Sequence, residues 1–212
     1  MSYYYWEGEI SKSECEKLIK EFDTSKSVDA STGNYQGKDA LYPEEIEAAK
    51  KEDNWDFEKN QLKNAGVPDD SIRRTKLNWF PTNHKYNKIL SDYVLKANKI
   101  MYHYNVTKFT PCQFARYDVG GFYEYHQDSG HQIVEYEKET RKISMTVQLS
   151  DPDSYEGGEF YFYNGNNKEY EPPIQEQGSI ICFDSRMWHR VAPVTKGVRY
   201  SLVSWILGPR FK

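Results

Sequence analysis

Two segments in the first half of the chain carry apolar residues at helical spacing. In residues 10–23 one face of a 3.6-residue period is apolar, formed by Cys15, Leu18, Ile19 and Phe22. A capping box could start this helix in either of two frames, Ser13 with Glu16 or Ser11 with Glu14. Residues 85–104 keep a longer apolar face, made of Tyr86, Ile89, Leu90, Tyr93, Val94, Ala97, Ile100, Met101 and Tyr104. The pattern therefore predicts two amphipathic helices.

The stretch between these helices, residues 24–70, is polar and weakly patterned. It indicates one helix over 44–64, ended by Gly66 and Pro68. The stretch has two interpretations, a lid over a site or a surface insertion, and the surface insertion is the simpler one.

The period changes from helical to alternating after Pro111. In residues 143–149 apolar side chains alternate with Ser144, Thr146 and Gln148, as in a half-buried strand. Further strands are predicted over 112–119, 122–127, 179–183, 188–194 and 198–207 and around Phe160 and Phe162, with a hairpin signal at Asn164 and Gly165. Helices first and short strands after them indicate an α+β, mainly β protein with a jelly-roll or barrel core.

Length and composition narrow the classes of protein. The 212 residues are typical of a single domain, 1–212, and the net charge of −4 disfavours general binding to nucleic acid or anionic membranes. No apolar stretch approaches the roughly 18 residues of a membrane span, and the N-terminus lacks the pattern of a secretory signal. No two cysteines form a CxxC pair, so we expect free, packed thiols and a cytoplasmic location for a chain with Cys15, Cys112 and Cys182.

Three residues of the β half form a candidate metal site. His126 and Asp128 are one residue apart on a predicted strand, so both side chains lie on one face. His189 lies 63 positions later, beside another predicted strand. Two imidazoles and one carboxylate form the facial triad of non-haem Fe(II) oxygenases. An isolated HxD is a weak signal, because a histidine on a strand is more often a packed core residue.

An arginine near the end of the chain adds context to this site. Arg199 follows His189 by ten positions, on the next predicted strand, and Trp205 shares its face at an even separation. A buried guanidinium without a partner is costly, so an arginine here should meet an anion, and its fork matches a carboxylate.

One more histidine lies close to the candidate site in sequence. His131 belongs to a polar loop over 129–141, and we expect it to be solvated rather than a metal ligand. The loop itself is either a closure over substrate or a solvated turn.

These residues stand in motifs that resemble the 2-oxoglutarate- and Fe(II)-dependent dioxygenases, in particular the prolyl 4-hydroxylase-like branch. A weaker resemblance extends to the leading helices and to RRTKLNWF at 73–80, similar to a strand that precedes the catalytic domain. The motifs are YDVGGFYEYHQD at 117–128, RKISMTVQLSDP at 141–152, YEGGEF at 155–160 and GSIICFDSRMWHRVAPVTKGVRYSLVSWILGP at 178–209. The resemblance implies a catalytic double-stranded β-helix over 111–209, supported by a helical region over 1–110.

The same resemblance implies roles for five residues at the centre of the site. His126, Asp128 and His189 match the iron ligands. Arg199 matches the basic residue that binds the distal carboxylate of 2-oxoglutarate, and Tyr117 matches a tyrosine that donates to that carboxylate. Tyr117 also has a plainer interpretation as an ordinary aromatic residue of the sheet.

Four other residues are implied at the edges of the site. Gln148 occupies a position that often holds a tyrosine facing the co-substrate, and its amide can still donate a hydrogen bond. Trp205 matches an aromatic residue of the pocket wall, with core packing as the alternative. Tyr123 and Arg141 match positions near the substrate, and each could instead be a surface or packing residue.

Two departures from prolyl 4-hydroxylases bear on the substrate. Arg199 stands where those enzymes often carry lysine, and it can hold a carboxylate at least as well. Leu207 stands where they often carry histidine, which removes a polar contact to substrate. The departures put peptidyl proline in question more than the chemistry.

The resemblance implies an enzyme that binds Fe(II), 2-oxoglutarate and O₂, with ascorbate as reductant. It would hydroxylate a C–H bond while 2-oxoglutarate becomes succinate and CO₂, and it favours a proline-containing peptide or protein as partner. The alternatives are a free amino acid or other small molecule, or demethylation of nucleic acid, which the acidic charge disfavours. A non-catalytic β-barrel binding module and a structural metal protein are the alternatives outside catalysis.

Overall fold

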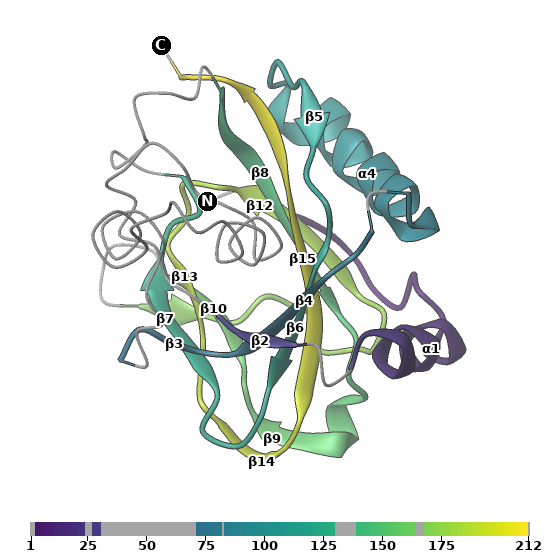
Figure 1. The fold of residues 1–212 in the computed structure, drawn as a ribbon. Coiled ribbons are helices and arrows are strands. Elements are labelled where there is room, and N and C mark those ends of the chain that lie inside the picture. The colour runs from purple at the N-terminus through teal and green to yellow at the C-terminus, as the bar shows by residue number, and fades with distance from the viewer. Residues whose placement is uncertain are drawn as a thin grey trace, which may run out of the picture.

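Two antiparallel sheets face each other, and two helices cover the outside of the larger one (Figure 1). The computed structural model describes residues 3–23, 27–30, 71–81, 83–129, 139–163 and 168–211. The expected helix at 44–64, the Asn164–Gly165 hairpin, His131 and most of the 129–141 loop lie outside the described residues. No helix of the described part of the chain is long and apolar enough to cross a membrane.

The larger sheet, called here the major sheet, has eight strands. Its long central strands β8 (Glu139–Gln148) and β15 (Arg199–Pro209) are paired over most of their length, from Ser201 opposite Gln148 to Pro209 opposite Glu139. In spatial order the strands are β1 (Tyr3–Trp6), β12 (Ile180–Asp184), β8 (Glu139–Gln148), β15 (Arg199–Pro209), β6 (Gln113–Tyr117), β4 (Lys76–Trp79) and β2 (Val28–Asp29), and β5 (Lys108–Phe109) also pairs with β15.

The minor sheet has five short strands and holds two of the three candidate metal ligands. Its order is β11 (Glu169–Tyr170), β10 (Phe160–Tyr163), β13 (His189–Val191), β7 (Phe122–His126) and β3 (Arg73–Arg74). A two-stranded ribbon of β9 (Tyr155–Gly157) and β14 (Val194–Gly197), preceded by a 3₁₀ turn at Pro152–Ser154, joins the ends of the sheets (Figure 1). This arrangement confirms the predicted mainly β fold of the double-stranded β-helix type.

The first predicted helix is α1 (Lys12–Phe22), and its start is fixed by one of the two expected capping frames. Ser11 Oγ accepts from the backbone N–H of Glu14 at 3.4 Å and donates to Glu14 Oε2 at 3.2 Å. These bonds satisfy one of the backbone donors that every helix start leaves unpaired, so the Ser11–Glu14 frame is the one that forms.

The second predicted helix is shorter than its apolar pattern. Helix α4 spans Lys85–Ala97, and a π-helical turn follows over Asn98–Tyr102. The change has a local cause, because the Asn98 side chain exchanges two hydrogen bonds with the backbone of Tyr104, at 2.9 and 3.0 Å. His103 takes a positive φ of 53° between them, which ends the helix before residue 104.

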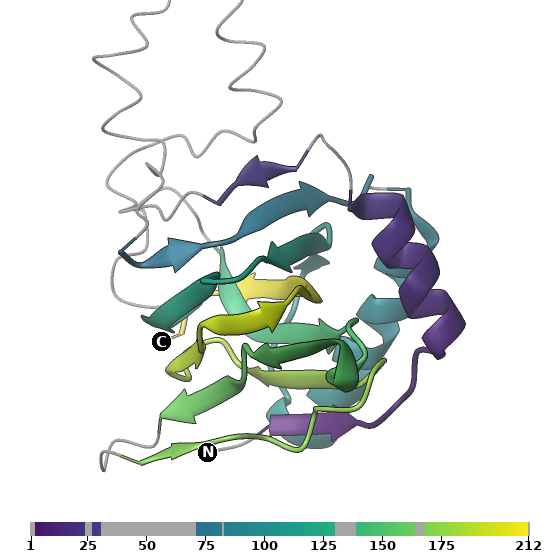
Figure 2. The same cartoon turned by 90° about the horizontal axis from the view of Figure 1, so that it is seen from below.

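The helices pack on the outer face of the major sheet and form the outer core (Figure 2). Alternate strand positions supply its sheet side, so the two-residue period seen in the sequence sorts side chains between two cores. The three cysteines lie in this outer core and are free thiols, as expected from the sequence. Burial raises the pKa of Cys15 to about 11 and that of Cys112 to about 12. The outer core includes Leu18, Phe22, Leu90, Val94, Phe114, Ile143, Met145, Val147, Ile180, Leu202 and Ile206.

The inner core lies between the two sheets. The other set of alternate strand positions points into it, including Ala115, Tyr117, Ile181 and Phe183 from the major sheet and Phe160, Phe162 and Val191 from the minor sheet. The N-terminal region supplies strands as well as helices, because β1, β2 and β4 extend the major sheet and β3 the minor one. The space between the two sheets is thus lined largely by apolar side chains.

The helix–sheet contact predicts the effect of one substitution on stability. Leu90 in α4 is fully buried, whereas Leu95 in the same helix is 46% exposed. Leu90→Ala should lower the free energy of unfolding by about 2–5 kcal/mol, because it leaves a cavity in the outer core. Leu95→Ala, the matched control, should change it by less than about 0.5 kcal/mol. Urea unfolding followed by circular dichroism measures both, and equal losses would contradict the described packing.

Candidate active site

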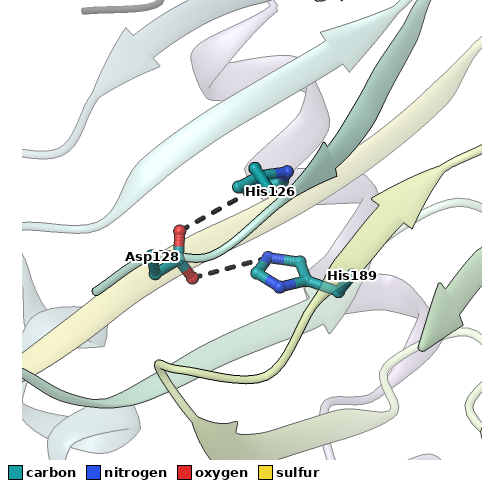
Figure 3. Close-up of side chains that lie close together, drawn as sticks. All are labelled: His126, Asp128 and His189. Atoms are coloured by element: carbon teal, nitrogen blue, oxygen red, sulfur yellow. Dashed lines mark ion pairs between the residues drawn. The ribbon is translucent and has the colours of Figure 1, made fainter. Parts of the chain in front are cut away.

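Three side chains converge between the sheets at the ends of two neighbouring strands (Figure 3). His126 ends β7, Asp128 follows two residues later, and His189 begins β13 directly opposite His126 in the ladder. Asp128 Oδ1 lies 3.7 Å from His126 Nε2, and its Oδ2 lies 3.5 Å from His189 Nε2. One ligand atom from each residue falls within 4.8 Å of the others. The spacing predicted from the sequence therefore produces a convergent donor set.

Hydrogen bonds fix the orientation of both imidazoles. The Nδ1 of His126 lies 2.8 Å from the Glu124 carbonyl oxygen, and that of His189 lies 2.9 Å from the Met187 carbonyl oxygen. A carbonyl only accepts, so each Nδ1 carries the proton and donates it. In the neutral ring the Nε2 atom then carries no proton, and its lone pair points toward Asp128. This is the tautomer that a metal ligand needs.

The carboxylate is held by the opposite sheet. Asp128 Oδ2 accepts from Ser144 Oγ on β8 at 2.6 Å, and Ser144 Oγ lies 2.9 Å from Ser185 Oγ. Because Ser144 and Ser185 are both fully buried, solvent does not compete for these bonds. The carboxylate is therefore oriented before any ligand arrives.

The protonation states suit a divalent cation. Burial and, to a smaller extent, the nearby His189 together lower the pKa of His126 to about 3, so this imidazole is neutral at pH 7. Burial alone would raise the pKa of the Asp128 carboxyl, but the two imidazoles, the Arg141 cation and the Ser144 hydroxyl outweigh it and lower that pKa to about 2. Two imidazole nitrogens and one carboxylate oxygen fit Fe(II), with coordination positions left for other ligands.

Aromatic rings enclose the buried histidine. The Phe183 ring meets the His189 ring edge-on at 4.7 Å, and Phe160 lies 5.6 Å away. His189 is only 5% exposed, so the ligand side of β13 is dry and rigid.

A buried cation without an anion lies deeper between the sheets. Arg199 is 2% exposed and pairs across the ladder with Tyr117, whose ring centroid lies 5.4 Å from its Cζ. Its Nη1 has no hydrogen-bond partner among the described residues. A carboxylate would satisfy this orphaned donor, which fits the expected contact with the distal carboxylate of 2-oxoglutarate.

A glycine makes room for this arginine. Gly158 has a φ of +70°, and a Cβ there would lie 2.9 Å from Arg199 Cδ and 2.9 Å from Val194 Cγ2. The GGE motif noted in the sequence therefore has a steric reason, because only a residue without a side chain lets Arg199 pass.

The side-chain amide of Gln148 makes its hydrogen bonds within the protein. Its Nε2 donates to the Ser150 carbonyl oxygen at 3.3 Å and to the Tyr155 hydroxyl at 2.8 Å, which uses both amide hydrogens. The Ser150 carbonyl fixes which end of the amide is Nε2, since a carbonyl cannot face the amide oxygen. The ring of Tyr155 lies against Gly158, on the same side as the Arg199 stem. The donation from Gln148 to the co-substrate expected from the sequence stays a prediction, and it would require one of these two hydrogen bonds to break.

The expected substrate residues lie around the triad. The Tyr123 ring stacks on His126 at 3.5 Å between centroids, with an angle of 14° between the planes. The Arg141 guanidinium lies 3.8 Å from the Trp205 ring centroid, and its Nη1 is 3.9 Å from Asp128 Oδ1. The structure thus brings Tyr123, Arg141 and Trp205 to the metal end of the barrel, while their contact with substrate stays a prediction.

Sequence reasoning did not single out three residues of this region. Tyr155 and Gly158 were noted only as members of the YEGGEF motif at 155–160, with no role of their own. Arg73 contacts Tyr123 with its Cζ 4.4 Å from the ring centroid. For Arg73 the sequence did offer a signal, because this arginine begins the RRTKLNWF segment, which resembles a strand that precedes the catalytic domain.

Comparisons with known proteins agree with this geometry. Residues 112–207 match the sequence profile described as the 2OG-Fe(II) oxygenase superfamily. A PKHD-type hydroxylase of a Synechococcus strain is 34% identical over 91 residues, which are 42% of this chain and 39% of that protein. The match therefore spans well under two thirds of the relative's length.

Two solved structures share the fold along almost the whole chain. A prolyl-4-hydroxylase of Pseudomonas putida has a TM-score of 0.64 and 16% identity, covering 99% of this chain and 93% of its own. A viral collagen prolyl hydroxylase of Paramecium Bursaria Chlorella virus-1 has a TM-score of 0.62 and 18% identity, covering 98% and 97%. At these identities the likeness establishes the fold alone.

The convergent donor set predicts the metal affinity of two variants. Asp128→Ala removes the anionic ligand, so the affinity for Mn(II), an oxygen-stable probe for the site, should fall by more than about 100-fold. Ser144→Ala only frees the carboxylate, and a loss of about 10-fold is expected. Isothermal titration calorimetry measures both, with Asp92→Ala on the exposed face of α4 as the control. An Asp128→Ala protein that binds Mn(II) as tightly as the Asp92→Ala control would contradict the assigned site.

Proposed function

We propose that the chain, whose residues 112–207 match the 2OG-Fe(II) oxygenase superfamily, is a hydroxylase dependent on Fe(II), 2-oxoglutarate and O₂. One observation carries the proposal: the donor set of His126, Asp128 and His189 lies between the same sheets as the buried, unpaired Arg199. A structural metal site would leave Arg199 without an anion. A module that only binds an anion would not need the three metal-ligand side chains to converge.

Three side chains of the protein would hold the metal. His126 and His189 present Nε2 lone pairs, and Asp128 presents a carboxylate oriented by Ser144. When bound there, Fe(II) supplies the redox chemistry that puts one oxygen atom of O₂ into a substrate C–H bond and the other into succinate, as 2-oxoglutarate loses CO₂. The dry surroundings of His189 protect this chemistry from water.

The chain orients the co-substrate from its far end. Arg199 donates through its free Nη1 to the distal carboxylate, and Tyr117 faces it from the paired strand. Gln148 holds the hydroxyl oxygen of Tyr155, so the Tyr155 O–H is left to donate in the same direction. Gln148 thereby acts as a positioning residue. Such preorganisation removes the entropy cost of orienting the co-substrate at each turnover.

The substrate that we propose is a proline residue in a peptide or protein. Support comes from the two structures of the same fold that are described as prolyl hydroxylases. It also comes from the position of Tyr123, Arg141 and Trp205 beside the triad. An extended proline-rich segment is already ordered, so it loses little conformational entropy when it binds along such a surface.

The proposed role of Arg199 predicts a graded loss of co-substrate affinity. Arg199→Ala should weaken 2-oxoglutarate binding to the Mn(II)-loaded protein by about 2–5 kcal/mol, because the carboxylate then lacks its charged partner. The affinity of Arg199→Lys for 2-oxoglutarate should fall between those of Arg199→Ala and wild type, since lysine keeps the charge but loses the two-pronged hydrogen bonding of the guanidinium. Calorimetry gives both values, with Mn(II) affinity unchanged as the control. Unaltered 2-oxoglutarate binding in Arg199→Ala would place the co-substrate elsewhere.

The proposed substrate predicts a mass change on proline. Proline-rich peptides incubated with the protein, Fe(II), 2-oxoglutarate and ascorbate as reductant should gain one oxygen atom, located on proline by fragmentation in the mass spectrometer. Under ¹⁸O₂ the added oxygen should be heavy, and the Asp128→Ala protein should add none. If free amino acids or other small molecules stimulate succinate release while no peptide gains oxygen, the peptide assignment is wrong.

A further inference from the structure

Most arginines of the described residues are either paired with a carboxylate or exposed. Arg199 and Arg73 are the two that are buried and have no carboxylate partner within this part of the chain. The paired ones are Arg116 with Asp23 and Asp118, Arg141 with Asp128, Arg186 with Asp184 and Arg190 with Glu169, whereas Arg74 and Arg210 are exposed. The argument that gives Arg199 an anion therefore applies equally to Arg73.

Arg73 reaches across the barrel at the metal end. It lies on β3, paired with Tyr123 of β7, and it is 8% exposed. Its Nη2 donates to Gln113 Oε1 at 3.2 Å, and Gln113 belongs to β6 of the opposite sheet. Figure 1 shows β3 beside β7 at the edge of the minor sheet. The side chain of Arg73 thus spans the space between the sheets rather than pointing outward.

The contacts of Arg73 do not neutralise its charge. Gln113 offers a neutral amide oxygen, and Tyr123 offers the face of its ring at 4.4 Å from Cζ. The Nε of Arg73 has no hydrogen-bond partner in the part of the chain that the structure describes. A neutral acceptor and an aromatic face compensate a buried cation only in part, whereas a carboxylate matches both its charge and its fork.

A second unpaired donor faces the same end of the barrel. The Nε1 of Trp205 is buried without a partner, and Trp205 is 6% exposed. Gln113 pairs with Val203 in the ladder, so Trp205, two residues further on, shares the face of Val203 and lies diagonally across from Gln113. Two orphaned donors, Arg73 Nε and Trp205 Nε1, therefore border the region beside Tyr123.

The position relative to the metal ligands distinguishes this region from the co-substrate pocket. Tyr123 contacts Arg73 and also stacks on His126, so Arg73 is one ring away from a ligand of the triad. Arg199 belongs to β15 and packs against Tyr117 and Gly158. A group held by Arg73 would lie beside the Tyr123 ring, which stacks on the metal ligand His126.

We propose that Arg73 binds a carboxylate of the prime substrate, so that the enzyme selects anionic substrates. The inference rests on the proposed hydroxylase function and names its substrate class. The carboxylate comes either from an acidic residue beside the hydroxylated position of a peptide or from the α-carboxylate of a free amino acid. In both cases the carboxylate accepts from Arg73, and the C–H bond that reacts lies on the triad side of Tyr123.

The first test needs no variant. Proline peptides that carry Asp or Glu next to proline are compared with the same peptides carrying Asn or Gln, and free amino acids with their amides. Binding to the Mn(II)-loaded protein is measured by calorimetry, and turnover by succinate release with Fe(II). The wild-type protein should favour the carboxylate member of at least one pair by about 10-fold or more. Whether that pair is a peptide or an amino acid identifies the source of the carboxylate.

The second test uses the neighbouring arginine as a control. Arg73→Gln should abolish the preference, Arg73→Lys should retain part of it, and Arg74→Gln, on the exposed side of the same strand, should leave it intact. The affinity for 2-oxoglutarate should stay the same in all three proteins. Arg73→Lys keeps the charge, so it remains informative if Arg73→Gln does not fold.

Three results would overturn the proposal while leaving the hydroxylase function in place. They are substrate turnover in which wild type shows no preference for the carboxylate, a preference that Arg73→Gln retains, and a loss of 2-oxoglutarate affinity in that variant. Failure of the hydroxylase function looks different, because then no substrate supports succinate release by wild type.

Discussion

The carboxylate of Asp128 contacts side chains of both sheets, and the rest of the site depends on its position. One oxygen faces His126 and the other faces His189, both on the minor sheet, while Ser144 of the major sheet donates to it at 2.6 Å. Because the carboxylate bridges the layers, a change in their separation would separate the ligands. The outer core of helices and major sheet therefore serves the site by keeping β8 in place.

Buried charge is the second constraint. A barrel interior lined by Phe160, Phe162 and Phe183 has few partners for ions, yet it contains the guanidinium groups of Arg199 and Arg73. Neither has an anion among the described residues, and each is packed against a tyrosine. A buried cation without an anion is costly, and we propose that an anionic ligand binds each of these two guanidinium groups.

Much of this arrangement could be predicted from the sequence because it depends on local periods. The helical face of α4 and the alternation in β8 follow from side-chain spacing alone, and the HxD spacing places two ligands on one face. The π-helical turn could not be predicted, since it follows from the bonds of the Asn98 side chain to Tyr104. Strand β1 also gave no signal, because its aromatic run fits several environments equally well.

The less predictable parts of the site depend on contacts between distant segments. Arg73 is buried because it reaches Gln113, 40 positions away, and nothing in its own neighbourhood of the sequence indicates that contact. Gln148 is tied to Tyr155 by a turn whose path only the fold defines. Gly158 is the exception, since a paired glycine before a strand already indicates a close approach, although not which side chain makes it.

The account is tested most directly by anaerobic addition of 2-oxoglutarate to the Fe(II)-loaded protein, followed by visible absorption. A 2-oxo acid that chelates Fe(II) through its keto and carboxylate oxygens gives a charge-transfer band, which neither component gives alone. We expect this band in wild type, its loss in Asp128→Ala, and its appearance only at much higher 2-oxoglutarate concentration in Arg199→Ala. A wild-type protein that binds both Fe(II) and 2-oxoglutarate without developing the band would contradict the account, because metal and co-substrate would then occupy separate sites.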